Sequence, residues 1–236
     1  MQHRCMITGI GLVSSIGNSH EAVVDRLQRL EHGFRPHIFL DNPNLPVKVA
    51  GPVREFDFPS ADWRSWTWPD RYSIDRDLLR GLPPHGVFSV CALQDAVRDA
   101  DLTFDDLSSD RTGLYCASAG SPRLMCRNME NMHRCRGERG NPLAVVSSIS
   151  GTLNFNLAAW LGVRGSNCGF VSACSSSTHA LGYACDENRL GRQDRMVVVG
   201  AEELSAESTL PFAAMRALSK NPDPDSASRP FDRDRD

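Results

Sequence analysis

The sequence has 236 residues, of which 41% are hydrophobic and 23% are charged, with 26 Lys and Arg against 29 Asp and Glu. This composition is ordinary for a globular protein and excludes disordered, collagen-like and coiled-coil classes. The net charge of −3 argues against a nucleic-acid binder that works through bulk electrostatics, because that mode needs a basic excess. Any anionic partner must therefore meet a local basic patch.

The eight cysteines form no Cys-x-x-Cys pair, and several lie inside apolar runs where a buried thiol is expected. This pattern indicates a reducing compartment. The N-terminal apolar stretch is short, is broken by Thr8, Gly9 and Gly11, and lacks a small-residue cleavage site. No other stretch approaches the ~18 apolar residues of a membrane span. The sequence thus predicts a soluble, cytoplasmic protein without a membrane span.

The first third of the chain opens with a strand, a turn and a helix. Residues 5–18 read as a buried strand that runs into a Gly/Ser turn, and residues 19–30 show helical spacing with Ser19 as the N-cap. Residues 33–86 are rich in proline and contain three closely spaced tryptophans. We expect a long irregular excursion with short helical pieces there.

Strand and helix patterns alternate after residue 86. We expect helices at 87–102 and 172–193, strands at 111–118, 164–171 and 194–203, and either two small-residue-rich helices or one broken helix at 142–163. Several of the strands are uninterrupted apolar runs, which favours an α/β layered fold with a mostly parallel or mixed sheet. The first half of the 172–193 helix is small or apolar on all sides, so we expect it to be buried between layers.

Cys174 is the strongest candidate for a catalytic residue. It follows a predicted buried strand and opens the predicted buried helix in the run GFVSACSSSTHALG. A thiol at a helix N-terminus lies near unpaired N–H groups and a partial positive charge, which favour the thiolate. The Cys174 N–H can also point at a developing oxyanion, as in other nucleophile elbows. The alternative is that Cys174 is one more small buried residue, as expected of the other seven cysteines.

Several motifs in one order carry a family resemblance: ITGIGLVSSIGN, SPR at 121–123, VSACSSSTHALG, GAEE at 200–203, FAAMRALS at 212–219 and ASRPFDRDRD at the end. Together they resemble β-ketoacyl-acyl carrier protein synthases of the thiolase-like condensing-enzyme superfamily, closest to the type I elongating branch. The resemblance implies a layered α-β-α fold with a mixed sheet, one half of a duplicated fold. It also implies that Cys174 takes an acyl chain from a carrier-protein thioester before decarboxylative condensation with malonyl-carrier protein.

The same resemblance implies binding residues and partners. Ile149 falls at about the position of a dimer-interface residue that sets substrate length, and Ser118, Ala119 and Gly120 lie near the pocket floor; ordinary core packing is the alternative. Carrier-protein docking is implied for two arginine clusters, Arg76 with Arg80, and Arg134 with Arg136 and Arg139. The alternative is that these arginines are ordinary solvent-exposed surface residues. Nearby acidic residues also reduce the net positive charge of both clusters. The implied partners are acyl and malonyl thioesters of carrier protein and a second condensing-enzyme chain, in a homodimer or heterodimer. No cofactor is implied.

The sequence also departs from the family pattern. Residues 1–236 resemble an N-terminal domain and stop inside the family's Arg-Asp-Gly motif, before the two histidines, the lysine and the Gly-rich loop on which decarboxylation relies. We expect either a truncated form or a separate polypeptide that completes the site. The GAEE motif has one glycine where two are usual, and Pro83-Pro84 interrupts a stretch that is normally helical.

Two other functional readings remain open. A noncatalytic condensing-enzyme-like subunit that pairs with a complete synthase is one alternative, although the presence of Cys174 argues against it. The other is a thiolase-type or acyl-CoA-dependent transferase, which the SACSSS and RPFDRDRD patterns disfavour.

Histidines and glycines offer no competing site. His179 lies five residues after Cys174 and should face away from the thiol, so we interpret it as a packed helix residue. The other histidines lack metal-ligand spacing, and we expect a surface or loop position for each: His3, His20, His32, His37, His85 and His133. No metal site is therefore expected. The GIG at 9–11 does not satisfy the dinucleotide-binding pattern, and the serines after Cys174 lack a GxSxG motif.

Overall fold

The structure is a computed structural model that describes residues 4–37, 43–138 and 140–236. The chain divides into two compact units. The first comprises residues 1–11 and 57–203, and the second comprises residues 12–56 and 204–236. All candidate site residues of the sequence analysis lie in the first unit.

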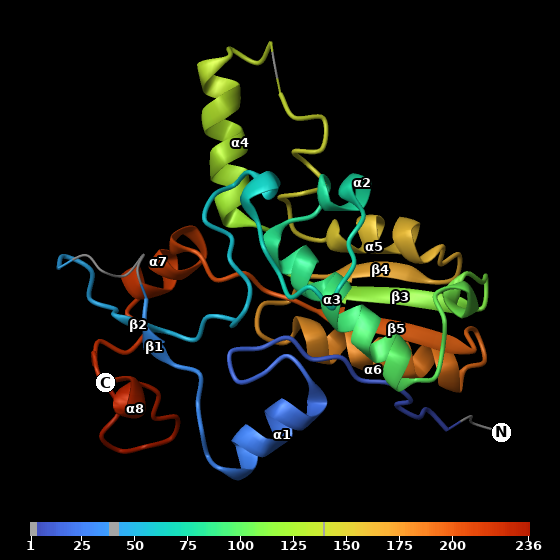
Figure 1. Cartoon of the computed structure of the whole chain (residues 1–236), viewed down its shortest axis with the longest axis horizontal. Helices are drawn as coiled ribbons and strands as arrows, with labels where there is room; N and C mark the ends of the chain where they lie inside the picture. Colours follow the sequence, from blue (N-terminus) through green and yellow to red (C-terminus); the bar gives the residue numbers. More distant parts are fainter. Residues whose placement is uncertain (1–3, 38–42, 139) are drawn as a thin grey trace. The chain divides into compact units, whose positions relative to one another are not determined.

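The first unit is built on a parallel sheet of three strands in the order β4-β3-β5 (Figure 1). Its strands are β3 (Thr112–Ala117), β4 (Asn167–Phe170) and β5 (Arg195–Gly200). Its helices are α2 (Arg76–Leu79), α3 (Pro84–Asp99), α4 (Pro122–Arg134), α5 (Leu153–Leu161) and α6 (Ser176–Arg189), with 3-10 helices η2 (Trp63–Ser65) and η3 (Asp105–Leu107). The layered α/β class is confirmed, but every strand pair described in this sheet is parallel rather than mixed.

Alternation along β3 divides the core into two clusters, one on each face of the sheet. Leu114 and Cys116 pack with α3 and α5 on one face, whereas Tyr115 and Ala117 pack with Ala180 and Ala184 of α6 on the other. Successive side chains of a strand point to opposite faces, so a fully buried strand needs a helical layer on each side. All six residues of β3 are buried for this reason.

The second unit holds the remaining short elements: α1 (His20–Gln28), β1 (Arg35–Pro36), β2 (Val49–Ala50), α7 (Ala206–Ala214) and α8 (Pro224–Ala227). Strands β1 and β2 pair antiparallel. Val47 and Ala50 form a small core with Leu45, Ala213 and Leu218. Ser19 caps α1 by accepting a hydrogen bond from the Ala22 N–H, as the sequence predicted. The terminal arginines form the expected loop ion pairs, such as Arg229 with Asp232 at 2.8 Å.

The buried strand predicted within residues 5–18 is wrong. Residues 4–13 form no strand, and the side chains of Met6 and Ile7 are 67% and 69% exposed. Instead, the segment runs against α3, where a Cβ on Gly9 would lie 2.3 Å from the Ala96 carbonyl oxygen. An apolar run becomes a buried strand only where a neighbouring strand and a covering layer are available, and none of the described strands pairs with this one.

Helix α6 is also less buried than its composition predicted. Ala180 and Ala184 are its buried residues, and Tyr183 is 58% exposed. One face of α6 packs on the sheet, while nothing among the described residues covers the other. Small apolar side chains all around a helix permit burial on two sides, but the second side needs a second layer.

No described helix is long and apolar enough to cross a membrane.

Candidate active site

The candidate residues gather at the carboxyl edge of the sheet because the strands are parallel. Ala117, at the end of β3, lies opposite Phe170 of β4 and Gly200 of β5. The segments that follow these three strands therefore leave the sheet at the same edge, where functional groups of parallel α/β sheets collect. They carry Ser118–Gly120, Cys174 and Glu202 with Glu203, respectively.

Cys174 sits in a sharp turn between β4 and α6, and its side chain is exposed. The preceding residue, Ala173, has φ of +52°, which places a non-glycine residue in the left-handed region. A turn of this kind between a strand and a helix presents the next side chain at the edge of a sheet. The prediction that Cys174 opens a buried helix is wrong in detail: α6 begins at Ser176, with Ser175 as N-cap.

Serine side chains hold this turn together. Ser176 Oγ accepts a hydrogen bond from the Ser172 N–H at 2.8 Å and donates one to the Ala173 carbonyl at 2.7 Å. Both bonds of Ser176 join the turn itself, and Ser175, the N-cap of α6, makes no side-chain cap bond. The Cys174 N–H finds no acceptor in the part of the chain that the structure describes. It is available to a substrate oxygen.

His179 is exposed rather than packed, which corrects the prediction for this residue. Its Nδ1 lies 2.7 Å from Ser172 Oγ, within hydrogen-bond distance. The ring therefore braces the start of the turn from the first part of α6. The His179 ring is exposed because no described residues cover this side of α6.

Close packing of β5 against the start of α6 explains a glycine of the GAEE motif. A Cβ on Gly200 would lie 2.4 Å from Ser177 Oγ, so any larger residue would require the Ser177 side chain to move. Ala201, at the second position, continues the ladder by donating its N–H to the Ala117 carbonyl at 3.0 Å, and packs partly buried against the main core. The single glycine of the GAEE motif is therefore sufficient for β5 to pack against the start of α6.

The four residues predicted for the substrate pocket lie together. Gly120, with φ of +84°, packs so closely on residues 148–150 that an added Cβ would meet the Ser148 carbonyl oxygen at 2.6 Å and the carbonyl carbon of Ile149 at 2.8 Å. Ser150 Oγ donates to the Ala119 carbonyl at 2.7 Å. The Ile149 side chain is 40% exposed.

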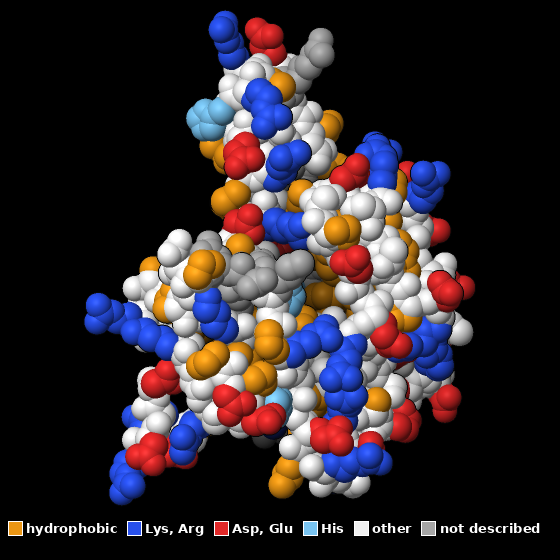
Figure 2. All heavy atoms as spheres, turned by 60° about the vertical axis from the view of Figure 1, so that its left-hand side comes forward, with side chains coloured by type: hydrophobic (Ala, Val, Ile, Leu, Met, Phe, Trp, Pro, Cys, Tyr) orange, Lys and Arg blue, Asp and Glu red, His pale blue; other side chains and the backbone are white. Residues whose placement is uncertain are grey.

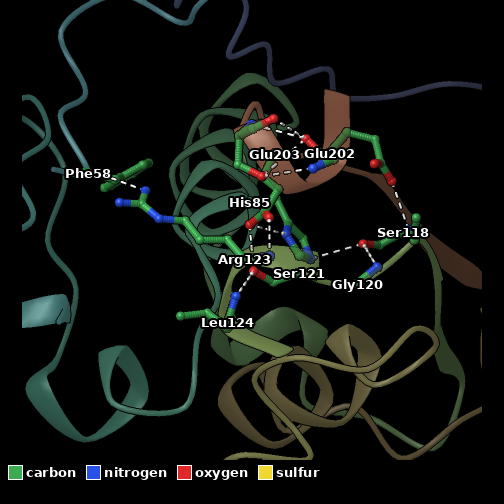
Figure 3. A network of polar contacts seen from close by, with 12 residues as sticks. Phe58, His85, Ser118, Gly120, Ser121, Arg123, Leu124, Glu202 and Glu203 are labelled. Carbon is green, nitrogen blue, oxygen red and sulfur yellow. Dashed lines mark hydrogen bonds and ion pairs between the residues drawn. The ribbon is translucent and has the colours of Figure 1, made fainter. Parts of the chain in front are cut away.

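A buried polar network fixes the loop that carries Ser118, Ala119 and Gly120 (Figure 3). His85 Nε2 lies 2.9 Å from Ser118 Oγ, which also accepts the Gly120 N–H at 3.1 Å. The Ser121 hydroxyl donates to Glu203 Oε2 at 2.6 Å. Three segments far apart in the sequence are thus joined: α3, the loop after β3 and the end of β5.

The two glutamates complete the network. Glu203 Oε1 accepts the Arg123 N–H at 3.3 Å, and Glu202 Oε1 accepts the Ala119 N–H at 2.8 Å. Glu203 Oε2 lies 4.0 Å from His85 Nδ1, which is close enough for charge attraction but too long for a hydrogen bond. Burial raises the pKa of the Glu203 carboxyl, but the neighbouring His85 ring, the Ser121 hydroxyl and the Arg123 N–H outweigh burial and lower it below its ordinary value.

His85 corrects the expectation of a surface or loop position, since it is 1% exposed. The residue lies in the first turn of α3, which begins at Pro84 with Pro83 as N-cap. A signal was present in the sequence: His85, Ser89, Leu93 and Val97 recur every four residues and are all buried. Extending the helical pattern back to the proline pair would have placed the imidazole on the buried face.

The predicted docking arginines occupy two separate segments. Arg76 and Arg80 lie at the two ends of α2; the guanidinium carbon of Arg76 is 5.9 Å from the centroid of the Trp63 ring, and Arg80 is 3.8 Å from Asp77. Arg76 also lines an open pocket between α2 and α5 with Asn156 and Trp160.

The second predicted docking cluster lies at the far end of α4. Arg134 and Arg136 are exposed there, and Arg139 lies outside the described residues. The sequence did not predict α4, which extends away from the sheet (Figure 1) and carries arginine side chains beside hydrophobic ones (Figure 2). Met125, Met129 and Met132 are exposed along it.

The cysteines divide by environment. Cys91 and Cys116 are buried, as expected, and burial raises the pKa of both thiols, that of Cys91 to about 12. Cys126 and Cys168 are exposed, and Cys5, Cys135 and Cys185 are only partly buried, so the expectation that all seven are buried holds for Cys91 and Cys116 alone. Among the described residues, no group of three or more His, Cys, Asp or Glu side chains is placed to hold a metal ion.

Comparison with known proteins agrees with this geometry. The family model described as β-ketoacyl synthase, N-terminal domain, matches residues 2–236. The 3-oxoacyl-[acyl-carrier-protein] synthase 1 of Haemophilus influenzae is 34% identical over 237 residues, and that of Escherichia coli K12 is 30% identical over 238 residues. Each match covers 99% of this chain and 55% of the relative.

A solved structure gives the same result for the fold. A β-ketoacyl synthase from Burkholderia phymatum matches with a TM-score of 0.82 and 26% identity, over 100% of this chain and 56% of that one. The chain spans about half the length of the relatives it matches. It belongs to the β-ketoacyl synthase family, and the part it contains is the N-terminal domain.

Proposed function

We propose that the chain performs the acyl-transfer step of a β-ketoacyl-carrier-protein synthase, with Cys174 as nucleophile. The supporting observation is the exposed thiol at a strained turn, at the position where the sequence resembles the nucleophile motif of the family. The Cys174 sulfur would attack the thioester carbonyl of an acyl-carrier protein. The phosphopantetheine thiol would leave with the proton that Cys174 gives up, and the acyl group would remain on the enzyme.

The Cys174 N–H would donate to the oxyanion of the tetrahedral intermediate, because it has no acceptor among the described residues. Ile149, Ser118, Ala119 and Gly120 would bound the acyl chain, and the buried network around His85 and Glu203 would keep their loop in place. In this proposal, Ser118 contributes through its backbone and its bond to His85, because its side chain is 5% exposed.

Carrier protein would dock on the exposed arginines Arg76, Arg80, Arg134 and Arg136, together with Arg139. Carrier protein is acidic, so this docking should weaken with salt and on charge reversal. The matched control for Arg80→Glu is Arg98→Glu, since Arg98 has a similarly exposed side chain and also pairs with an aspartate three residues away. Only the first variant should lose affinity for carrier protein, measured by surface plasmon resonance at two salt concentrations.

Complete condensation would need further groups. By resemblance, decarboxylation of the malonyl unit depends on histidine and lysine residues that this chain does not contain. Either further residues of a longer polypeptide or an associated condensing-enzyme chain would supply them, and we propose a cytoplasmic protein that forms a homodimer or a heterodimer with such a chain. The uncovered face of α6 also supports a second candidate, a noncatalytic subunit of a complete synthase.

Intact-mass measurement after incubation with an acyl-carrier-protein thioester tests the proposal. We expect a mass increase equal to the acyl group, lost in Cys174→Ala but retained in Cys168→Ser, the matched control with an exposed cysteine six residues away. Absence of the adduct in a demonstrably folded protein would contradict autonomous acyl transfer and favour the noncatalytic subunit.

A further inference from the structure

Cys5 and Cys185 are brought together by the fold although 180 residues separate them in the sequence. Cys5 lies in the N-terminal segment that forms no strand or helix, and Cys185 lies on α6. Both thiols are partly buried, unlike the fully buried Cys91 and Cys116.

One contact places the Cys5 thiol on a specific face of α6. Its sulfur lies 3.7 Å from Asn188 Oδ1, to which the thiol donates. Residues three apart on a helix share a face, so Asn188 presents its carbonyl oxygen on the same side as Cys185. The Asn188 side-chain amide donates to the Gln193 carbonyl at 3.0 Å, which fixes the orientation of that oxygen.

The electrostatics of the Cys5 thiol agree with this placement. Burial is the main cause that raises the pKa of the Cys5 thiol; Cys185 raises it further, while Arg189 lowers it. Arg189 lies four residues after Cys185 on α6, so all the groups that act on Cys5 belong to one stretch of the helix. The contact of Cys5 with Asn188, three residues after Cys185 on the same face of α6, places the Cys5 thiol beside Cys185.

We propose that Cys5 and Cys185 are a redox-active pair that closes to a disulfide and ties the N-terminal segment to α6. The oxidant is a small-molecule disulfide of the glutathione class. One cysteine thiolate attacks it, forming a mixed disulfide and releasing one glutathione thiol. The other cysteine then attacks the mixed disulfide and releases the second. Two protein thiols are oxidised, one glutathione disulfide is reduced to two thiols, and the two protons go to those thiols.

The N-terminal segment can make the small adjustment that bond formation requires. It is not held by a strand ladder, and Met6 and Ile7 beside Cys5 are largely exposed. In the reduced state the Cys5 thiol contacts α6 through its hydrogen bond to Asn188. In the oxidised state it would be fixed to the helix that follows Cys174. This inference does not depend on acyl transfer by Cys174.

Peptide mapping after oxidation tests the pair directly. The folded protein is incubated with glutathione disulfide, free thiols are blocked, and the chain is cut with trypsin and chymotrypsin. Cleavage after Arg4, Phe170, Tyr183 and Arg189 separates Cys5, Cys168, Cys174 and Cys185 onto different peptides. We expect a cross-linked peptide that joins Cys5 to Cys185, and its yield should fall sharply when the oxidation is done in concentrated urea.

Two variants sharpen the test. Cys185→Ser should abolish the cross-link and leave a glutathione adduct on Cys5, whereas Cys126→Ser, which removes an exposed cysteine of α4, should leave the cross-link intact. The oxidised wild type should melt at a higher temperature than the reduced protein, by at least about 5 °C, and Cys185→Ser should show no such rise. Separate glutathione adducts on Cys5 and Cys185, or pairing of Cys5 with another cysteine, would overturn the proposal.

Discussion

The His85 imidazole lies in the interior between the Ser118 hydroxyl and the Glu203 carboxylate. Buried polar groups are stabilising only while their partners are present, because an unpaired hydroxyl or carboxylate in the interior is costly. His85 therefore holds the loop after β3 through Ser118, at the point where the predicted acyl pocket begins.

Replacing His85 tests this role. His85→Ala should lower the free energy of unfolding by about 2–4 kcal/mol, since it leaves a cavity and removes a partner of Ser118. The matched control is His133→Ala, because His133 is exposed near the end of α4. Urea denaturation of the two variants measures the difference. Equal, small effects would contradict a structural role for His85.

Glu203 should give the protein a specific dependence on pH. Its pKa in the folded state lies below the ordinary value, so the carboxylate contributes stability that is complete above its unfolded pKa of about 4.3. That contribution is lost as the pH falls through the folded pKa. The unfolding free energy of the wild type should thus exceed that of Glu203→Gln most clearly above about pH 5, and the gap should narrow below about pH 4.

Urea denaturation of both proteins across this pH range measures the gap. Other titrating carboxylates, such as Asp232, occur in both proteins and cancel in the comparison. A gap that stays constant from neutral to acid pH would show that the charge of Glu203 makes no contribution.

Gly120 serves two requirements, a positive φ and a close approach to residues 148–150. Gly137 also has a positive φ, of +76°, but a Cβ there would meet nothing within 4 Å. Gly137→Ala should cost only the left-handed penalty of ~1 kcal/mol. Gly120→Ala should cost a further ~1–3 kcal/mol because of the overlap with backbone atoms. Thermal unfolding of the pair separates the two effects, and equal losses would argue against the close packing of this loop.

At the scale of the element, the surroundings of α6 decide how a substitution on this helix changes the stability of the protein. It packs on the sheet through Ala180 and Ala184, while an added Cβ on Gly182 would meet nothing within 4 Å. Glycine in an open helix interior is less stable than alanine by ~0.5–1 kcal/mol. Gly182→Ala should therefore raise the melting temperature of this chain.

The opposite result would be equally informative. A lower melting temperature for Gly182→Ala would mean that the exposed side of α6 is covered in solution by another chain, with no room for a methyl group. Repeating the measurement over a range of protein concentrations distinguishes a partner copy from an effect within one chain.

At the scale of the whole molecule, exposed apolar side chains around the candidate site predict association. Val171, Leu181 and Tyr183 are 57%, 45% and 58% exposed, and they lie on or beside α6. Soluble monomers rarely expose extended apolar patches. Sedimentation velocity should show self-association or poor solubility, and a stable monomer over a wide concentration range would contradict this expectation.

Local sequence patterns determined which segments form the main elements. Apolar runs of strand length predicted β3 and β5, the strand predicted at 164–171 corresponds to β4, helical spacing predicted α3 and α6, and Ser19 marked the start of α1. These features depend on periodicity and on capping groups a few residues away, so they can be read from the sequence alone. The position of Cys174 between a strand and a helix followed in the same way.

Tertiary structure alone decided what those elements contact. The 5–18 segment has the composition of a buried strand but no strand to pair with, and α6 has the composition of a buried helix but a covering layer on only one face. The pairing of His85 with Ser118, and of Cys5 with the face of α6, joins residues far apart in the chain. Which residues are buried, and which residues they contact, depends on segments that are distant in the sequence. Periodicity shows only that a segment has one face that could be buried.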